Sequence, residues 1–219
     1  MDFENTTGSI ANLIDHTLLK TDTTREEMSR LCAEAKVYGF ASVCIPPYFV
    51  AHCKSQLEDS TVKICTVVGF PLGFDSSFAK VEAIKRALSD GADEIDAVVN
   101  IAAIKDENWS YVRNEVQSFA RATHIKGKII KLILETSLLE KEELVKLCDL
   151  LNQEELDFVK TSTGFDGGAS TEIVAELRKL LKPEIKIKAS GGIDTAEKAK
   201  QLVKAGANRI GTSNALELI

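Results

Sequence analysis

Residues 156–165 read LDFVKTSTGF, a short apolar run that ends in a lysine and continues into small polar residues. Leu156 to Val159 has the character of a buried strand, interrupted only by Asp157. Lys160 ends this strand, and burial of a lysine is costly because it disfavours the charged form and lowers the pKa. A lysine with a lowered pKa is an amine nucleophile. A single lysine at a strand end usually extends to water, so the rest of the chain must decide between these interpretations.

Strand-like apolar runs alternate with helical patterns on both sides of this segment. The expected strands are 13–17, 41–45, 62–68, 94–99, 128–134, 156–160, 185–189 and 209–211. The expected helices are 24–38, 48–57, 77–89, 108–123, 139–151, 170–181, 195–205 and a last one that starts at 214. This alternation predicts an α/β protein, a (β/α)8 TIM barrel that forms a single domain over residues 1–219. An open doubly wound sheet is the alternative, but no GxGxxG motif follows the first strand.

Composition narrows the classes of function. The chain of 219 residues is 44% hydrophobic and 27% charged with a net charge of -6, which argues against nucleic acid or an anionic membrane as the main partner. The sequence has no run long enough to span a membrane and no signal-peptide pattern, so we expect a cytoplasmic protein. Five cysteines without a CxxC pair indicate free thiols in a reducing compartment. Three separated histidines give no indication of a metal site.

Charged residues interrupt several of the expected strands. Asp15 and Asp96 lie within apolar runs, and Lys188 ends the run IKIKA. In such a barrel the active site lies at the carboxyl ends of the strands. Side chains alternate along a strand, so Lys188 is expected to face the barrel interior and Ile187 the helices. Lys186 shares the interior side but lies lower, and we interpret it as structural, with its tip at the lower opening or paired with a carboxylate.

Two lysines at one barrel mouth repel each other, and we expect each to lower the pKa of the other. A neutral amine attacks a carbonyl carbon to form a Schiff base, and the iminium then withdraws electrons from a neighbouring carbon–carbon bond. Such a reaction needs a proton shuttle, for which Asp96 is the candidate, directly or through water. The alternative for Asp96 is a structural pairing with one lysine, and both roles are compatible. No metal and no cofactor is expected.

Small-residue loops follow the last three expected strands. They are Thr161 to Gly164, Ser190 to Gly192 and Gly211 to Ser213. Phosphate sites in these barrels often form from the loops after strands seven and eight together with the start of a following helix. The three loops therefore predict a phosphate site at the top of the barrel.

Eight segments carry a resemblance to a known family. They are LIDHTLLK (13–20), VCIPPYFV (43–50), VVGFPLG (67–73), GADEIDAVVNI (91–101), LILETSLL (132–139), FVKTSTGF (158–165), IKASGGIDTAEKA (187–199) and GANRIGTSNA (206–215). In this order they resemble the deoxyribose-phosphate aldolases, which are class I (Schiff-base) aldolases of TIM-barrel fold. The resemblance implies a lyase of deoxyribose catabolism that reversibly cleaves 2-deoxy-D-ribose 5-phosphate to D-glyceraldehyde 3-phosphate and acetaldehyde.

The resemblance also implies roles for single residues. It implies that Lys160 forms the Schiff base, that Lys188 tunes it and exchanges protons, that Asp96 is the proton donor and acceptor, and that Asp15 supports the site. The positions that it implies for phosphate contacts are Gly164, Gly191, Gly192, Thr212 and Ser213. Relatives often form dimers or tetramers, and we expect a homodimer.

The chain departs from the family pattern at three places. Asp194 stands where arginine is usual, which reverses a charge near the phosphate loop. Pro46 stands where asparagine is common, and no tyrosine follows Ser213 to reach the site, so water or Asp96 must transfer protons.

Two other functions stay open. A sugar-phosphate isomerase explains the loops but not two converging lysines, and a non-catalytic binding barrel predicts that loss of a lysine has no effect. Reactivity of Cys44 and Cys65 near the site is also left open.

Overall fold

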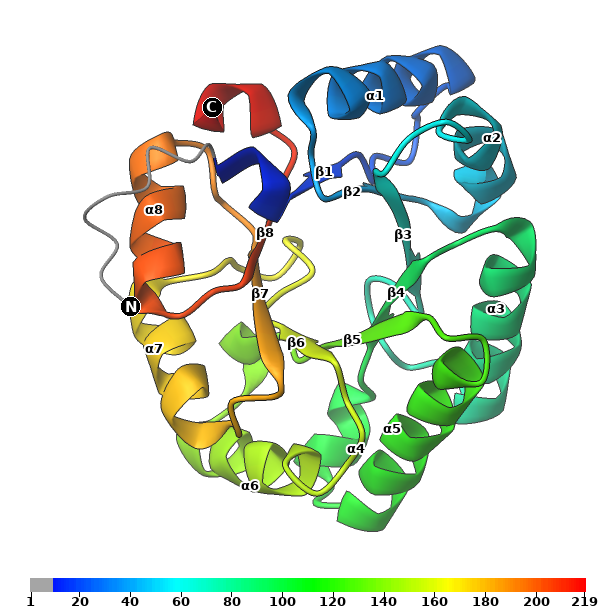
Figure 1. Ribbon diagram of the computed structural model, residues 1–219. Coiled ribbons are helices and arrows are strands. Elements are labelled where there is room, and N and C mark those ends of the chain that lie inside the picture. The colour runs from blue at the N-terminus through cyan, green and yellow to red at the C-terminus, as the bar shows by residue number, and fades with distance from the viewer. Residues whose placement is uncertain (1–9) are drawn as a thin grey trace.

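The computed structural model of the chain describes residues 10–219 and shows a ring of parallel strands with helices outside it (Figure 1). The strands are β1 (Ile14–Thr17), β2 (Ser42–Ile45), β3 (Lys63–Val68), β4 (Glu94–Val98), β5 (Ile129–Ile133), β6 (Phe158–Lys160), β7 (Lys186–Ser190) and β8 (Arg209–Thr212). Each strand pairs in parallel with the next, and β8 pairs with β1, so the barrel is closed. The predicted (β/α)8 barrel is confirmed, and the open doubly wound sheet is wrong.

Helices connect successive strands on the outside of the barrel. The α-helices are α1 (Arg25–Tyr38), α2 (Val50–Gln56), α3 (Ser77–Asp90), α4 (Ile101–Lys105), α5 (Trp109–His124), α6 (Lys141–Leu151), α7 (Thr171–Leu180) and α8 (Ala196–Ala205). Short 3-10 turns are η2 (Ile10–Leu13), η3 (Pro47–Phe49), η4 (Thr136–Leu138) and η5 (Ala215–Leu218). The prediction of one domain over residues 1–219 stays a prediction, and its residues 1–9 lie outside the described part.

Local sequence signals account for the helix boundaries. Thr24 caps α1 and Glu27 returns a hydrogen bond to the backbone of Thr24, so the predicted capping box is present. Gly39 ends α1 with a φ of 67°, a left-handed conformation that glycine adopts without strain. Ser76, Ser170 and Thr195 accept hydrogen bonds from the first turns of α3, α7 and α8 in the same way.

Two expected helices differ from the structure. The segment 48–57 begins as η3 after Pro46 and only then continues as α2, because proline fixes the entry of the chain. The segment from Asn214 forms η5 rather than an α-helix. A further short helix, α4, lies between β4 and α5, where a loop was expected.

The apolar core lies between the strands and the helices, while the barrel interior carries charge. On β7, Ile187 is buried against the helices and Lys188 is buried inside the barrel, as the alternation predicted. Lys186 is exposed at the start of β7, with its Nζ atom 5.5 Å from the centre of the Phe158 ring. Within residues 10–219, no helix has the length and apolar character required to cross a membrane.

Candidate active site

Strand register brings the predicted lysines and aspartate together. Lys160 on β6 lies opposite Lys188 on β7, and Asp96 on β4 lies opposite Lys131 on β5. Residues opposite each other in neighbouring strands extend to the same face of the sheet. All four side chains therefore extend into the barrel interior, where Lys160 is 2% exposed and the other three are fully buried.

The Asp96 carboxylate lies between the basic side chains. Its Oδ2 atom is 3.0 Å from Lys160 Nζ and 2.8 Å from Lys188 Nζ. Its Oδ1 atom is 2.9 Å from Lys131 Nζ and accepts a hydrogen bond from Cys65 Sγ at 3.0 Å. One carboxylate oxygen thus joins the two lysines that the sequence predicted at the barrel mouth, and both Nζ atoms reach it from neighbouring strands.

Below Asp96 the ion pairs continue across the barrel. Lys188 Nζ is 2.6 Å from Asp15 Oδ2, and Asp15 Oδ1 is 2.5 Å from Arg209 Nη1. Lys131 Nζ is 2.5 Å from Glu94 Oε2, and Arg209 Nη2 is 3.3 Å from Glu94 Oε1. We call this set the buried charge network; its members are Asp15, Glu94, Asp96, Lys131, Lys160, Lys188 and Arg209. It holds three carboxylates and four basic side chains, so it is neutral when one basic side chain loses a proton.

The pKa values of this network reflect its ion pairs more than its burial. Burial disfavours the ionised form of Asp96, but the charges of Lys131, Lys160 and Lys188 outweigh it and hold the pKa of Asp96 well below its usual range. The pKa of Asp15 is likewise lowered, because attraction to Lys188, Lys131 and Arg209 exceeds the cost of burial. Both carboxylates therefore stay ionised at neutral pH.

The expectation that the two lysines lower each other's pKa is wrong for Lys188. Burial alone would lower the pKa of Lys188, but Asp15 and Asp96 outweigh burial and hold this pKa well above its usual range. The physical reason is that two carboxylates contact Lys188. The sequence indicated a pairing of Asp96 with one lysine but did not place Asp15 beside Lys188. Lys188 is therefore a fixed ammonium cation beside Lys160.

Gly211 explains how Lys188 fits in this space. A Cβ atom at Gly211 would lie 2.8 Å from Lys188 Cε and 3.0 Å from Ser190 Cβ, so any side chain there would displace the lysine. Gly211 is also opposite Asp15 in the β1–β8 register. Gly211 thus makes room for the ion pair between Lys188 and Asp15.

The two cysteines near the site form part of its wall. Cys44 and Cys65 are opposite each other on β2 and β3, and both are fully buried. Burial raises the pKa of Cys65, whose thiol donates to Asp96. Cys44, Cys65 and Asp96 are close enough to be metal ligands, but both Asp96 oxygens already accept hydrogen bonds from ammonium groups. A divalent cation would add to the positive charge of the network, so this donor set is suited to lysine ammonium groups rather than to a metal.

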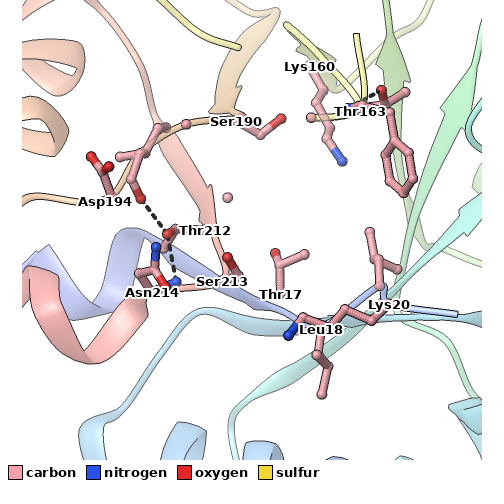
Figure 2. Close-up of a pocket in the computed structure, with 17 residues that line it drawn as sticks. Thr17, Leu18, Lys20, Lys160, Thr163, Ser190, Asp194, Thr212, Ser213 and Asn214 are labelled. Carbon is pink, nitrogen blue, oxygen red and sulfur yellow. Dashed lines mark hydrogen bonds between the residues drawn. The ribbon is translucent and has the colours of Figure 1, made fainter. Parts of the chain in front are cut away.

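A cavity of about 330 Å³ opens above Lys160. Lys160 extends from β6 into this pocket, and Thr212, Ser213 and Asn214 line another side of it (Figure 2). All five predicted phosphate-contact residues line the pocket, namely Gly164, Gly191, Gly192, Thr212 and Ser213. Asp96, Lys188 and Asp15 do not line it and lie beneath Lys160, inside the barrel.

Close backbone contacts shape the loop at the rim of this pocket. Gly191 has a φ of 90°, and a Cβ atom there would lie 2.8 Å from Gly168 Cα. Glycine at this position is therefore required both by conformation and by space. The hydroxyl of Thr212 donates to the Ile193 carbonyl at 2.6 Å and accepts from Asn214 N–H at 3.0 Å, so it fixes the loop rather than pointing freely at a ligand.

Charge at the rim differs from the charge in the barrel. Asp194 lines the pocket beside Gly192, and its side chain is exposed. Lys20 lines the pocket and brings positive charge from the β1 side. Lys198, in the first turn of α8, donates a hydrogen bond from its Nζ atom to the Gly192 carbonyl, at a distance of 2.7 Å. Phe165 is 60% exposed and contacts Phe70 edge-to-face, with ring centres 5.4 Å apart. The rim thus combines backbone groups, both signs of charge and an apolar wall.

Sequence reasoning missed four charged residues of the site. Lys131, Glu94 and Arg209 complete the buried charge network, and Glu135 is buried next to the Lys160 loop. The available signal was the one used for Asp96, a charged residue inside an apolar strand, which Lys131 also shows in IIKLILE. Glu94 and Arg209 begin their strands, where charge is common, so only the register identifies them.

A closed parallel barrel with a lysine cluster around one carboxylate, below a pocket, defines a barrel enzyme of the aldolase class. Residues 9–215 match the family model described as the DeoC/LacD family aldolase. The chain belongs to this family. It is 47% identical over 213 residues to the deoxyribose-phosphate aldolase of Thermococcus kodakarensis, covering 96% of this chain and 95% of the relative.

Two further relatives extend the comparison. The deoxyribose-phosphate aldolase of Caldicellulosiruptor saccharolyticus is 47% identical over 216 residues, with 98% of each chain covered. Among solved structures, the deoxyribose phosphate aldolase of Aeropyrum pernix, described as having a unique tetrameric structure, superimposes with a TM-score of 0.89. It is 34% identical, and the match covers 95% of this chain and 88% of that chain. The resemblance noted in the sequence is therefore confirmed at the level of family and fold.

Proposed function

We propose that this chain reversibly cleaves 2-deoxy-D-ribose 5-phosphate to D-glyceraldehyde 3-phosphate and acetaldehyde through a Schiff base on Lys160. The observation that carries the proposal is the single Asp96 oxygen that lies 3.0 Å from Lys160 Nζ and 2.8 Å from Lys188 Nζ, directly beneath the pocket. The names of the relatives give the substrate. A sugar-phosphate isomerase that works through acidic groups, or a non-catalytic binding barrel, does not require two lysines at one carboxylate oxygen.

The first step needs an uncharged amine. The buried charge network has one basic side chain more than it has carboxylates. We assign the uncharged state to Lys160, because it lines the pocket and because, within residues 10–219, its one carboxylate contact is shared with Lys188. The Lys160 nitrogen then attacks the aldehyde carbon of the open-chain sugar. Lys188, held as an ammonium cation, provides the proton with which the carbinolamine oxygen leaves as water.

The second step breaks the carbon–carbon bond. The substrate hydroxyl at C3 gives its proton to Asp96, directly or through water, and the electrons of the C2–C3 bond move into the iminium to form an enamine. D-Glyceraldehyde 3-phosphate leaves, the enamine carbon takes up a proton, and water releases acetaldehyde from Lys160. Because its pKa is low, Asp96 passes this proton on to Lys188, which gave up a proton in the first step, and Lys188 then supplies the proton that the enamine carbon takes up. Asp15 supports the step by holding Lys188 in place.

The phosphate end of the substrate belongs at the rim. We assign it to the loops that contain Gly164, Gly191 and Gly192 and to Thr212 and Ser213, which line one side of the pocket. Backbone N–H groups at the start of a helix favour an anion, and α8 starts directly after this loop. Lys160 and these loops line the same pocket, so one substrate with an aldehyde at one end and a phosphate at the other can contact both.

We further propose that the protein is cytoplasmic and forms a homodimer, with a tetramer as the alternative. Exposed Tyr48, Phe74 and Phe78 support self-association, because large apolar side chains at a surface favour burial between copies. Light scattering coupled to size exclusion tests the oligomeric state. No cofactor, nucleic acid or membrane enters the proposal.

The direct test of the function is product formation. The purified chain is incubated with 2-deoxy-D-ribose 5-phosphate, and acetaldehyde is measured with an alcohol dehydrogenase couple. We expect acetaldehyde and D-glyceraldehyde 3-phosphate in equal amounts from the wild type and none from Lys160→Ala. Conversion of the sugar phosphate to an isomer without acetaldehyde would overturn the proposal in favour of the isomerase.

A further inference from the structure

Glu135 follows β5 in an uncommon backbone conformation. Its φ and ψ are 48° and 62°, in the left-handed region that side chains other than glycine rarely adopt. The other non-glycine residue of the described chain with positive φ is Glu107, whose side chain is 75% exposed in a surface turn. Glu135, in contrast, is 2% exposed. A strained and buried residue beside a functional site suggests that the strain serves the site.

The Glu135 carboxylate accepts hydrogen bonds but forms no ion pair within residues 10–219. Both of its oxygens accept from Thr163 N–H at 3.2 Å, and Oε2 also accepts from the Thr163 hydroxyl. Among residues 10–219, no lysine, arginine or histidine forms an ion pair with it. Burial raises the pKa of Glu135 although the hydrogen bonds from Thr163 oppose this shift. The charge of Lys160 also opposes the shift but contributes least, and burial of a carboxylate that forms no ion pair is costly.

The contacts of Glu135 hold the loop that follows the Schiff-base lysine. Leu134 N–H donates to the Lys160 carbonyl at 2.9 Å, and Thr136 N–H donates to the Thr161 carbonyl at 3.0 Å. The β5–β6 pairing thus continues past the strand ends on both sides of Glu135. Because the carboxylate fixes Thr163 as well, the backbone is tied at three points within four residues of Lys160.

This arrangement also fixes what the pocket wall offers to a ligand. The Thr163 hydroxyl donates a hydrogen bond to Glu135 and accepts one from Phe165 N–H at 3.1 Å. Thr163 and Gly164 both line the pocket beside Lys160. The orientation of this part of the wall is therefore set from behind, by a side chain that does not line the pocket.

We propose that Glu135 is a positioning residue that fixes the Thr161–Gly164 loop through Thr163 and thereby sets the approach of the Lys160 amine to the substrate carbonyl. The inference rests on the proposed Schiff-base function of Lys160. It assigns to the glutamate of LILETSLL a role in the reaction rather than in folding alone. A misplacement of about 1 Å at a reacting group lowers a rate by about 100-fold, so loss of this anchor affects turnover even in folded protein.

The test compares Glu135→Gln with Glu107→Gln, the matched control in the other left-handed glutamate. Glutamine retains the size but replaces one acceptor oxygen with a donor that opposes Thr163. We expect Glu135→Gln to lower kcat per folded molecule by about 10-fold to 100-fold, with a smaller change in KM, and Glu107→Gln to leave both unchanged. Unchanged kcat in folded Glu135→Gln protein, with only a lower Tm, would assign Glu135 to folding alone and overturn the proposal.

A second set of variants covers the case in which Glu135→Gln does not fold. Thr163→Val removes the donated hydroxyl, and Thr163→Ser restores it. We expect Thr163→Val to lower kcat and Thr163→Ser to recover it. Where both single variants fold, the double variant Glu135→Gln/Thr163→Val should have the kcat of the lower single variant, because the two residues act through one contact. Additive losses, or a fully active Thr163→Val, contradict the proposal.

The same samples separate this inference from the proposed function. Borohydride reduction in the presence of acetaldehyde measures Schiff-base formation on the wild type and on each variant. Absence of any adduct on the wild type would refute the Schiff-base function itself. An adduct on the wild type, together with normal rates of adduct formation in Glu135→Gln and in Thr163→Val, would refute only the positioning role.

Discussion

The barrel interior and the pocket rim differ in how their charged groups are paired. In the interior, Asp96 contacts Lys131, Lys160 and Lys188 at 2.8 to 3.0 Å, and all four side chains are buried. At the rim, Asp194 is exposed and makes no ion pair within the described residues, and the side chains of Lys198 and Thr212 hold the carbonyls of Gly192 and Ile193. The charged groups of the interior are therefore paired with one another, whereas Asp194 at the rim is not.

The difference between interior and rim matches the part of the proposed reaction that each region serves. A reaction that moves protons and opens a carbon–carbon bond needs groups that are placed and charged before the substrate arrives. A phosphate tolerates many arrangements of N–H groups and cations. We therefore expect interior substitutions to change turnover by orders of magnitude and rim substitutions to change substrate affinity by small factors.

The largest effect is expected at Lys160. Lys160→Ala removes the nucleophile, so we expect kcat to fall by about 10⁴-fold or more. The same change removes an amine that we assign as uncharged, so no pair of opposite charges is lost and the Tm should not fall by the amount typical of a broken ion pair. Activity assays and thermal unfolding of the same sample check both results. A strongly destabilised Lys160→Ala protein would show that the charge balance is misjudged.

Lys188→Met should behave in the opposite way for stability. It removes the ammonium group that pairs with both Asp15 and Asp96 inside the barrel. Removal of one partner from a buried ion pair lowers the free energy of unfolding by about 3–5 kcal/mol. We expect a matching loss in the free energy of unfolding together with a strong loss of kcat. Lys186→Met, two residues earlier on the same strand and exposed, is the control and should change neither. Equal effects of the two variants would contradict the described interior.

Acid should destabilise the protein through its buried carboxylates. The pKa values of Asp15 and Asp96 are lowered in the folded state, so their contribution to stability is present above the unfolded-state pKa of about 3.9 and is lost as the pH falls below it. Unfolding free energy measured against pH should therefore decline steeply below this point. Asp96→Asn should make that decline shallower, and an unchanged slope would count against the ionised state of Asp96.

The smallest effect is expected at Asp194. Asp194→Arg replaces a carboxylate with a cation beside the proposed phosphate loop, so KM for 2-deoxy-D-ribose 5-phosphate should fall by about fivefold at low salt, with kcat unchanged. The unphosphorylated sugar, 2-deoxy-D-ribose, is the internal control and should show no such gain. Equal changes in KM for both sugars would place the phosphate away from this loop.

Much of the fold was predictable because its signals are local. Alternation of strands and helices predicted the closed barrel, and Thr24 with Glu27 predicted the start of α1. The lysine at the end of FVK and the lysine in IKIKA were identifiable because charge in an apolar run is costly. The segment from Asn214 was not predictable in detail, since η5 depends on its contacts with β1 and α8.

The rest of the site depends on which strands are neighbours. Arg209 is 194 positions from Asp15 in the chain, yet they form an ion pair because β8 closes onto β1. This closure also decides the charge of Lys188, whose pKa is raised by carboxylates that no local pattern links to it. Glu135 became noticeable only through its backbone conformation and burial. Long-range register, rather than residue type, is what the sequence alone could not provide.

The most direct measurement is to trap the intermediate and identify the labelled residue. The protein is incubated with acetaldehyde, reduced with sodium borohydride, digested and analysed by mass spectrometry, with Lys160→Arg treated in parallel. We expect one added ethyl group, on the peptide that contains Lys160, and no such group in the variant. A label on the Lys188 peptide, or no label while the enzyme still releases acetaldehyde, would contradict a Schiff base on Lys160.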